Sequence, residues 1–174
     1  VGITDINETT LAESKKLIEE AGGKAFTYKF DVSKKEDYKT AFDDFVSKAG
    51  GLDLLINNAG VGDGGLVGEY DLQHWDWITG INQMAVIYGS HFAVPILKKQ
   101  GSGHVISIAS AAGLANMPNM GMCNVTKAAV ISLMETIYAE AKSFGVDTSV
   151  VCPTFFRSNI MQHHKGDENS VKIG

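Results

Sequence analysis

Three side chains in the second half of the chain could together transfer a proton: the hydroxyl of Ser110, the thiol of Cys123 and the amine of Lys127. Cys123 and Lys127 lie one turn apart in a segment with helical spacing, so both side chains should project from the same face. A positive charge beside a thiol lowers its pKa from the ordinary value of about 8.5, which would make Cys123 a suitable proton acceptor. By its pKa alone, the thiol would thus be suited to acid–base chemistry.

These residues fall within a longer set of motifs. Asn57-Asn58-Ala59-Gly60 follows an apolar run, Asn82 lies inside a helical segment, and Ser110-Ala-Ala-Gly113 precedes Cys123-Asn-Val-Thr-Lys127. This set, with its spacing, resembles the short-chain dehydrogenase/reductase family. The resemblance extends over nearly all of the chain, whereas the chain corresponds only to the central part of the family. Where the family has its catalytic tyrosine, this chain has Cys123.

The resemblance implies a role for each matching residue. The Ser110 hydroxyl would bind the substrate oxygen, the Lys127 ammonium would bind the nicotinamide ribose, and Asn82 would hold a water in a proton relay to that ammonium. Each residue also has a structural alternative, namely a turn serine, a solvated helical lysine and a polar side chain that fills a helix kink. For Asn82 the two interpretations are compatible.

The exchange of tyrosine for Cys123 affects the reach of the proton-transfer group. A tyrosine oxygen lies about 6.5 Å from its Cα, whereas a cysteine sulfur lies only about 3 Å away by ordinary covalent geometry. A proton-transfer group must be within hydrogen-bond reach of the substrate, and the thiol falls short of it. No tyrosine lies between Ser110 and Lys127. We therefore expect a large loss of rate, which a bridging water would only partly restore.

Two acidic residues are predicted to follow the first two strands and to contact a dinucleotide. Asp5 would accept hydrogen bonds from the adenosine ribose, and its charge would repel a 2′-phosphate, which favours NAD over NADP. The alternative for Asp5 is a capping role at the next helix. The resemblance places Asp31 and Val32 against the adenine. The alternative for Asp31 is that it begins a turn leading to Ser33.

Further cofactor contacts are predicted after the third strand and after the last one. Asn58 would hold the end of its strand together, while Ala59 and Gly60 would let the backbone approach the cofactor closely. The resemblance also assigns Pro153 to the cofactor site and places Ser158 where the family has a threonine that contacts the nicotinamide amide.

Strand-like and helical segments alternate along the chain, which predicts an α/β fold with a parallel sheet. The resemblance specifies a Rossmann-like, doubly wound sheet. The family's first strand and glycine-rich loop have no counterpart in this sequence. We therefore expect residues 1–174 to form a single, incomplete NAD-binding domain. The alternative is a complete protein with an open gap in its sheet.

Several local signals predict where the elements begin and end. Ser33 and Glu36 have the spacing of a capping box, and Asp71 could cap a long helix over residues 71–99. Pro95 should kink or end part of that helix. The nearly continuous apolar run over residues 52–57 is typical of a parallel strand that is covered on both faces.

Composition limits the classes of partner. The net charge of −5 argues against nucleic acid or anionic membrane as the main partner, and no apolar run approaches the roughly 20 residues of a membrane helix. His163-His164 lacks a third spaced ligand, so we expect no metal site. A cytoplasmic location is the default expectation. The apolar residues of the two long helices, with the resemblance, predict a homodimer or homotetramer.

The sequence thus leads to one hypothesis and one alternative. The first is an NAD(H)-dependent oxidoreductase that interconverts an alcohol and a ketone or aldehyde by hydride transfer, impaired by the cysteine at the catalytic tyrosine position. Its partner would be a small-molecule alcohol or carbonyl substrate. The alternative is a non-catalytic homologue that binds a dinucleotide or acts structurally.

Overall fold

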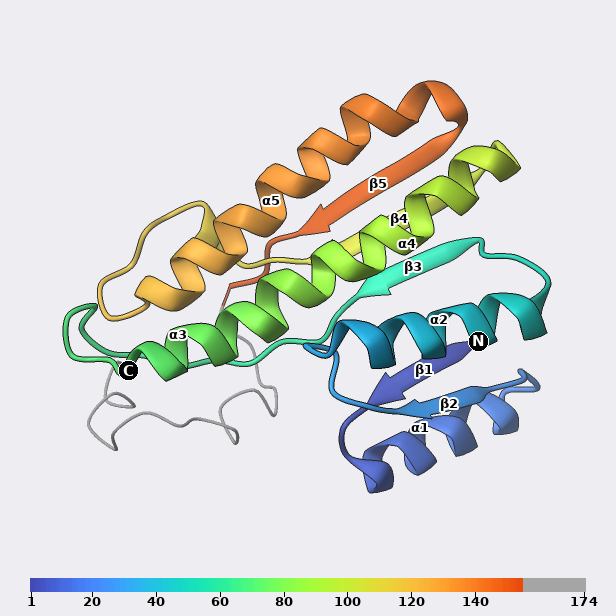
Figure 1. The fold of residues 1–174 in the computed structure, drawn as a ribbon, viewed down its shortest axis with the longest axis horizontal. Coiled ribbons are helices and arrows are strands. Elements are labelled where there is room, and N and C mark those ends of the chain that lie inside the picture. The colour runs from blue at the N-terminus through green and yellow to red at the C-terminus, as the bar shows by residue number, and fades with distance from the viewer. Residues whose placement is uncertain (155–174) are drawn as a thin grey trace.

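The computed structural model describes residues 1–154, in which strands and helices alternate as expected (Figure 1). In chain order the elements are β1 (Gly2–Asp5), α1 (Glu8–Glu20), β2 (Phe26–Lys29), α2 (Lys35–Ala49), β3 (Leu54–Asn57), α3 (Leu72–Thr79), the π-helical turn η1 (Gly80–Met84), α4 (Ala85–Gln100), β4 (Gly103–Ile108), the 3₁₀ turn η2 (Ala111–Gly113), α5 (Gly121–Ala141), the 3₁₀ turn η3 (Lys142–Phe144) and β5 (Val146–Val151). The predicted α/β architecture is confirmed.

All strand pairs are parallel, and they form two separate sheets. One contains β1 and β2, and the other has the order β3-β4-β5. Within residues 1–154 no strand is hydrogen-bonded between β1 and β3. Within these residues the two sheets are therefore not joined by strand hydrogen bonds.

Helices α4 and α5 pack on the larger sheet, and α1 packs on β1 and β2 (Figure 1). The main hydrophobic core lies between α4, α5 and the larger sheet, and its most deeply buried members are Ala93, Leu97, Val105, Val130, Ala141 and Val146. The expectation that β3 is covered on both faces is wrong. Leu54 is 45% exposed and Ile56 is 53% exposed, because α4 covers only one face of this strand.

The predicted capping box at the start of α2 is also wrong. The cap residue is Lys34, which makes no side-chain capping bond. The Ser33 hydroxyl instead donates to Asp31 Oδ1 at 2.8 Å, and the Ser33 amide donates to the same oxygen at 2.9 Å. The neighbouring carboxylate therefore takes the hydroxyl that the helix start would have used. Asp71, in contrast, caps α3 as predicted and accepts a bond from the Gln73 amide.

The long helix continues through Pro95 to Gln100, so the proline does not end it. Proline removes one bond to the carbonyl four residues earlier, and His91 occupies that position on an exposed part of the helix. The departure from regular helix lies instead at η1, where the Ala85 amide donates to the Gly80 carbonyl. Turns of this type are frequent at functional sites.

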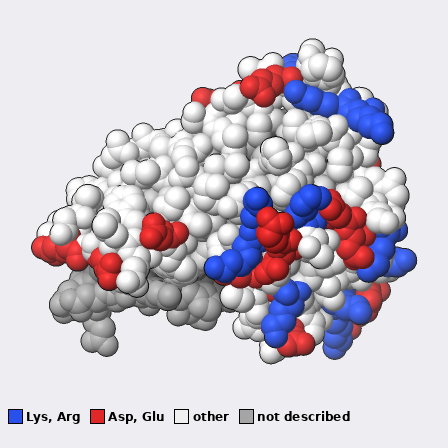
Figure 2. All heavy atoms as spheres, viewed as in Figure 1, with Lys and Arg blue, Asp and Glu red and all other residues white. Residues whose placement is uncertain are grey.

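Charged side chains are unevenly distributed over the surface. Figure 2 shows lysine and acidic groups gathered over α1 and α2, while the surface over α4 and the first part of α5 is mostly uncharged and the α3 end carries a few acidic groups. No helix within residues 1–154 is long and apolar enough to span a bilayer.

Gly113 permits the turn after β4 to approach α5 closely. A Cβ at this position would lie 2.7 Å from the carbonyl carbon of Lys127 and 2.8 Å from the amide nitrogen of Ala128. Both are backbone atoms, so the contact cannot be relieved by a side-chain rotation. The glycine thus sets the distance between Ser110 and the helix that carries Lys127.

We predict that Gly113→Ala lowers the free energy of unfolding by about 1–3 kcal/mol, because it overpacks a backbone contact. Denaturant titration of the full-length protein measures this change. Gly68→Ala is the matched control, since a Cβ there would meet no atom within 4 Å. Equal effects of the two substitutions would contradict the packing argument.

Candidate active site

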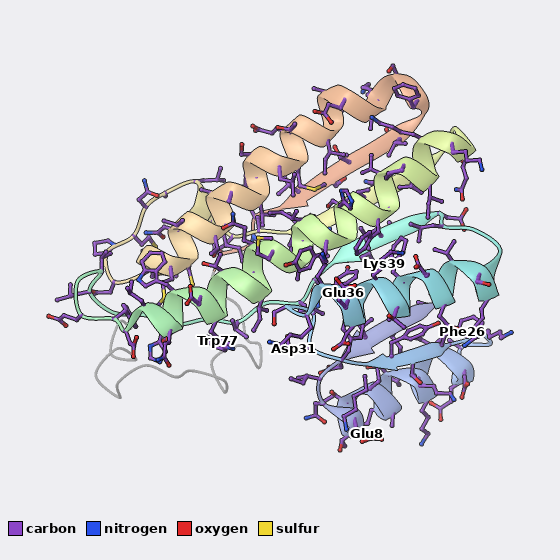
Figure 3. All side chains as sticks on the ribbon, viewed as in Figure 1. Glu8, Phe26, Asp31, Glu36, Lys39 and Trp77 are labelled. Atoms are coloured by element: carbon purple, nitrogen blue, oxygen red, sulfur yellow. The ribbon has the colours of Figure 1, made fainter. Side chains whose placement is uncertain are left out.

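The carboxyl ends of the parallel strands meet along one side of the molecule. Asp5 ends β1, Asp31 follows β2, Asn58 follows β3, Ser110 follows β4 and Pro153 follows β5. Figure 3 labels Asp31 on this side. Ligands of α/β sheets bind outside the carboxyl ends of the strands, so these residues border the expected binding crevice.

Cys123 and Lys127 lie on the buried side of α5, where they are 9% and 8% exposed. The alternative of a solvated lysine is therefore wrong. The Lys127 ammonium donates to the carbonyl oxygen of Ile108, at the end of β4, over 2.9 Å. Burial lowers the pKa of Lys127, and negative charge on Cys123 would raise it by a smaller amount. The amine is thus held beside the strand end that leads to Ser110.

The thiol of Cys123 is covered by the loop that follows β3. Its sulfur lies 3.7 Å from the backbone oxygen of Asp63, to which it donates a weak hydrogen bond. Burial raises the pKa of Cys123, and this outweighs the lowering effects of a backbone hydrogen bond at Asp63 and of the positive charge on Lys127. The expectation that Lys127 makes the thiol a suitable proton acceptor is wrong, because desolvation opposes the charged form.

Ser110 occupies the extended position before η2. Its oxygen accepts a hydrogen bond from the Ala112 amide at 3.1 Å, which orients the side chain. The Ala111 amide donates to the Pro153 carbonyl at 2.9 Å and so ties this turn to the end of β5. Ala112 packs against Cys123 in a second buried cluster. Ser110, Cys123 and Pro153 are therefore brought together by one turn.

Asn82 lies in η1 and is fully buried. Its amide group makes two hydrogen bonds to one loop residue: it accepts from the Val61 nitrogen at 2.8 Å and donates to the Val61 oxygen at 2.9 Å. A Cβ on Gly60 would lie 3.4 Å from Asn82 Oδ1 and 3.6 Å from Lys127 Nζ. Gly60 thus lies close to both polar groups, and a Cβ there would make only ordinary van der Waals contacts.

The polar group that secures the end of β3 is Asn57, which sequence reasoning missed. Asn57 is buried and donates to Ser107 Oγ at 3.0 Å and to Ser90 Oγ at 3.4 Å. Asn58, to which this role was assigned, is exposed, and so is Ala59. Side chains alternate along a strand, so only one of two adjacent asparagines can face the core. This alternation indicates that one of Asn57 and Asn58 is buried, but it does not indicate which of the two faces the core.

The predicted cofactor acids both make local hydrogen bonds. Asp5 accepts from the Asn7 amide at 2.8 Å and from the Thr10 hydroxyl at 2.9 Å. Asp31 accepts both bonds from Ser33, so the turn that was its alternative is formed. Each carboxylate oxygen can accept more than one bond, so these contacts leave capacity for a ligand. Val32 is partly buried beside them.

Other predicted residues receive less support. Ser158 and the pair His163-His164 lie outside the described residues. Within residues 1–154 no group of three or more histidine, cysteine or acidic side chains is arranged to hold a metal ion.

Comparison with known proteins identifies the family. Residues 1–169 match the family described as short chain dehydrogenase. The chain belongs to the short-chain dehydrogenase family. An uncharacterized oxidoreductase of Thermotoga maritima is 33% identical to it over 174 residues, which are 99% of this chain and 68% of that protein. A diacetyl reductase, named as (S)-acetoin forming, of Staphylococcus epidermidis is 30% identical over 172 residues, with 98% of this chain and 66% of that protein covered.

Solved structures of this family share the fold. A short-chain dehydrogenase of Burkholderia phymatum in complex with NAD superimposes with a TM-score of 0.88 at 35% identity, over 92% of this chain and 58% of that one. A 3-ketoacyl-ACP reductase of Sinorhizobium meliloti gives a TM-score of 0.86 at 27% identity, over 98% of this chain and 66% of that one. The chain therefore spans between half and about two thirds of the length of these dehydrogenases.

We predict that the Cys123 thiol reacts slowly at neutral pH. Burial raises its folded pKa above the ordinary value of about 8.5, so the thiolate fraction stays small until the pH exceeds that value. The rate of iodoacetamide modification should be measured against pH in a Cys152→Ser variant, with the denatured protein as reference. An inflection at or below the ordinary value would contradict the dominance of burial.

Proposed function

We propose that this dehydrogenase is an NAD(H)-dependent oxidoreductase that interconverts an alcohol and a ketone or aldehyde by hydride transfer, with proton transfer impaired at Cys123. The observation that carries the proposal is the buried Lys127 ammonium, which lies next to Gly60 and is bound to the strand end before Ser110. Within residues 1–154 no carboxylate is paired with Lys127, so its burial is costly, and binding of a polar ligand at the site would explain it.

The described residues fit one part of a nicotinamide dinucleotide. Asp5 offers carboxylate oxygens to ribose hydroxyls, Gly60 lacks a side chain where the ligand must approach, and Lys127 offers an ammonium to the second ribose. When bound, the nicotinamide supplies or accepts the hydride. A glycine-rich phosphate loop has no counterpart in this sequence, so the pyrophosphate is not accounted for by these residues.

Ser110 and the two α5 residues Cys123 and Lys127 (the α5 pair) would then surround the reacting group of the substrate. The Ser110 hydroxyl, oriented by the Ala112 amide, would donate to the substrate oxygen. The Cys123 thiol donates to the Asp63 carbonyl, and burial favours its protonated form, so it is a poor proton acceptor. Its side chain is also shorter than that of tyrosine. Lys127 would orient the ribose and add positive charge. The substrate would be a small alcohol or carbonyl compound, as the name of the Staphylococcus epidermidis relative indicates for that protein.

We expect the protein to be a homodimer or homotetramer. Val125 and Tyr138 of α5 are 53% and 44% exposed. The mostly uncharged surface over α4 and the first part of α5 in Figure 2 is suited to such an interface. Light scattering of the full-length protein decides between a monomer and an assembly.

We predict that Cys123→Tyr raises kcat for NAD-linked oxidation of secondary alcohols by roughly 10²- to 10⁴-fold, the usual range for a positioned acid–base group. NADH affinity, measured by fluorescence in the full-length protein, should not change. Cys123→Phe is the matched control, because it adds the ring and displaces the loop equally but carries no hydroxyl.

Three results would bear on the alternative. NADH binding without any gain in Cys123→Tyr would favour a non-catalytic homologue. A gain of equal size in Cys123→Phe would show that the ring, and not the hydroxyl, matters. Failure of every form to bind NADH would refute the proposed function.

We predict that Asp5→Ser shifts cofactor preference toward NADP by at least about tenfold, which corresponds to about 1.4 kcal/mol. The substitution removes the charge that would repel a 2′-phosphate, and it keeps a hydroxyl for the Asn7 amide. Parallel titrations with NADH and NADPH measure the ratio. Asp147→Ser, near the amino end of β5 in the other sheet, is the control. An unchanged ratio in Asp5→Ser would contradict the assignment.

A further inference from the structure

The loop over residues 61–70 lies directly above the start of α5. Val61 is bound by Asn82, and the Gly65 amide donates to the Asn119 carbonyl at 2.7 Å. Gly65 also forms an isolated bridge with Met120, just before α5 begins. Together with the contact between Asp63 and Cys123, these bonds hold the loop against position 123.

Tyr70, at the end of this loop, packs against the buried cluster that contains Ala112 and Cys123. Its hydroxyl oxygen is buried and has no hydrogen-bond partner among the described residues. A Cβ on Gly65 would lie only 2.5 Å from this oxygen, so the glycine makes room for it. An unpaired buried hydroxyl destabilises the fold and calls for an explanation, such as a catalytic or ligand-binding role.

The surroundings of Tyr70 favour a phenol that keeps its proton. The ionisable groups facing it are Asp63, Cys123 and His74, whose ring centroid lies 6.0 Å from that of Tyr70. Burial, with smaller contributions from negative charge on Asp63 and Cys123, raises the pKa of Tyr70 to about 12. The hydroxyl is therefore protonated at neutral pH, which suits a proton donor.

We propose that Tyr70 supplies from the loop the phenol that position 123 lacks, and that its hydroxyl donates the proton to the substrate oxygen during carbonyl reduction. The proposal rests on the proposed function. In this step the carbonyl carbon gains a hydride from the reduced nicotinamide cofactor, and the electron pair of the C=O π bond moves to oxygen. That oxygen takes the proton from the Tyr70 O–H bond. The resulting phenolate is reprotonated by water.

The neutral phenol of Tyr70 suits carbonyl reduction, the direction in which a proton must be donated. Alcohol oxidation needs a group that accepts a proton, and a phenol held in its neutral form does this poorly. Carbonyl reduction needs a donor, which Tyr70 is at neutral pH. The proposal for Tyr70 therefore concerns carbonyl reduction, and the test measures that direction.

The test is Tyr70→Phe in two backgrounds of the full-length protein, the unaltered chain and Cys123→Tyr. With NADH and a panel of small ketones, Tyr70→Phe should lower kcat at least about 100-fold in the unaltered chain, while KM and NADH affinity stay the same. In the Cys123→Tyr background the loss should be less than about threefold, because the introduced phenol supplies the proton. Tyr38→Phe is the matched control, since Tyr38 is a second phenol whose pKa burial raises to about 12 and it packs on Phe30 and Phe92 instead.

The outcomes separate this proposal from the proposed function. Equal losses in both backgrounds would mean that Tyr70 only supports the loop, and no loss in the unaltered chain would mean that it does not donate; either result overturns the proposal. An unaltered chain that binds NADH but reduces no ketone also overturns it, while activity in Cys123→Tyr alone would leave the proposed function standing. Absence of NADH binding in every form overturns both.

Discussion

The pairing of Asn82 with Val61 is the interaction on which the candidate site depends. The buried Asn82 side chain accepts from the Val61 nitrogen at 2.8 Å and donates to the Val61 oxygen at 2.9 Å, so it satisfies both backbone groups of this loop residue. The loop therefore leaves β3 in a fixed direction, with Gly60 beside Lys127 and Asp63 above Cys123. Without that amide the Val61 nitrogen and oxygen would lose both partners. The position of the Gly60 backbone beside Lys127 therefore depends on Asn82, while the contacts of Gly65 and Asp63 hold the rest of the loop over the thiol.

Burial governs the electrostatics of the α5 pair more than their mutual attraction does. Desolvation opposes the charged form of both groups, so it raises the pKa of Cys123 and lowers that of Lys127. The folded pKa of Lys127 lies below its unfolded value, so burying this amine costs stability at neutral pH. The cost disappears only as the pH rises toward the ordinary value. The site carries this cost, as functional sites commonly do.

Some features could be predicted from the sequence because they depend on near neighbours. Alternation of elements, the Asp71 cap and the shared face of Cys123 and Lys127 follow from local spacing, and the motifs at the strand ends indicated the family. Features that depend on competition or burial could not be predicted. Ser33 has a capping-box pattern, but Asp31 binds its hydroxyl. The sign of the Cys123 pKa shift depends on a loop 60 residues away in the chain, and nothing local relates Tyr70 to that thiol.

The π-helical turn at Gly80–Met84 has a consequence for how this region tolerates changes in length. A turn closed by a bond from Ala85 to Gly80 contains one residue more than a regular α-helical turn. Deleting that residue would leave an uninterrupted helix, but it would rotate α3 by about 100° relative to α4, the angle that one residue subtends. The tryptophans of α3 would turn out of their packing, and Asn82 would turn away from Val61. A helix that looks continuous in the sequence is therefore intolerant of a single-residue deletion at this point.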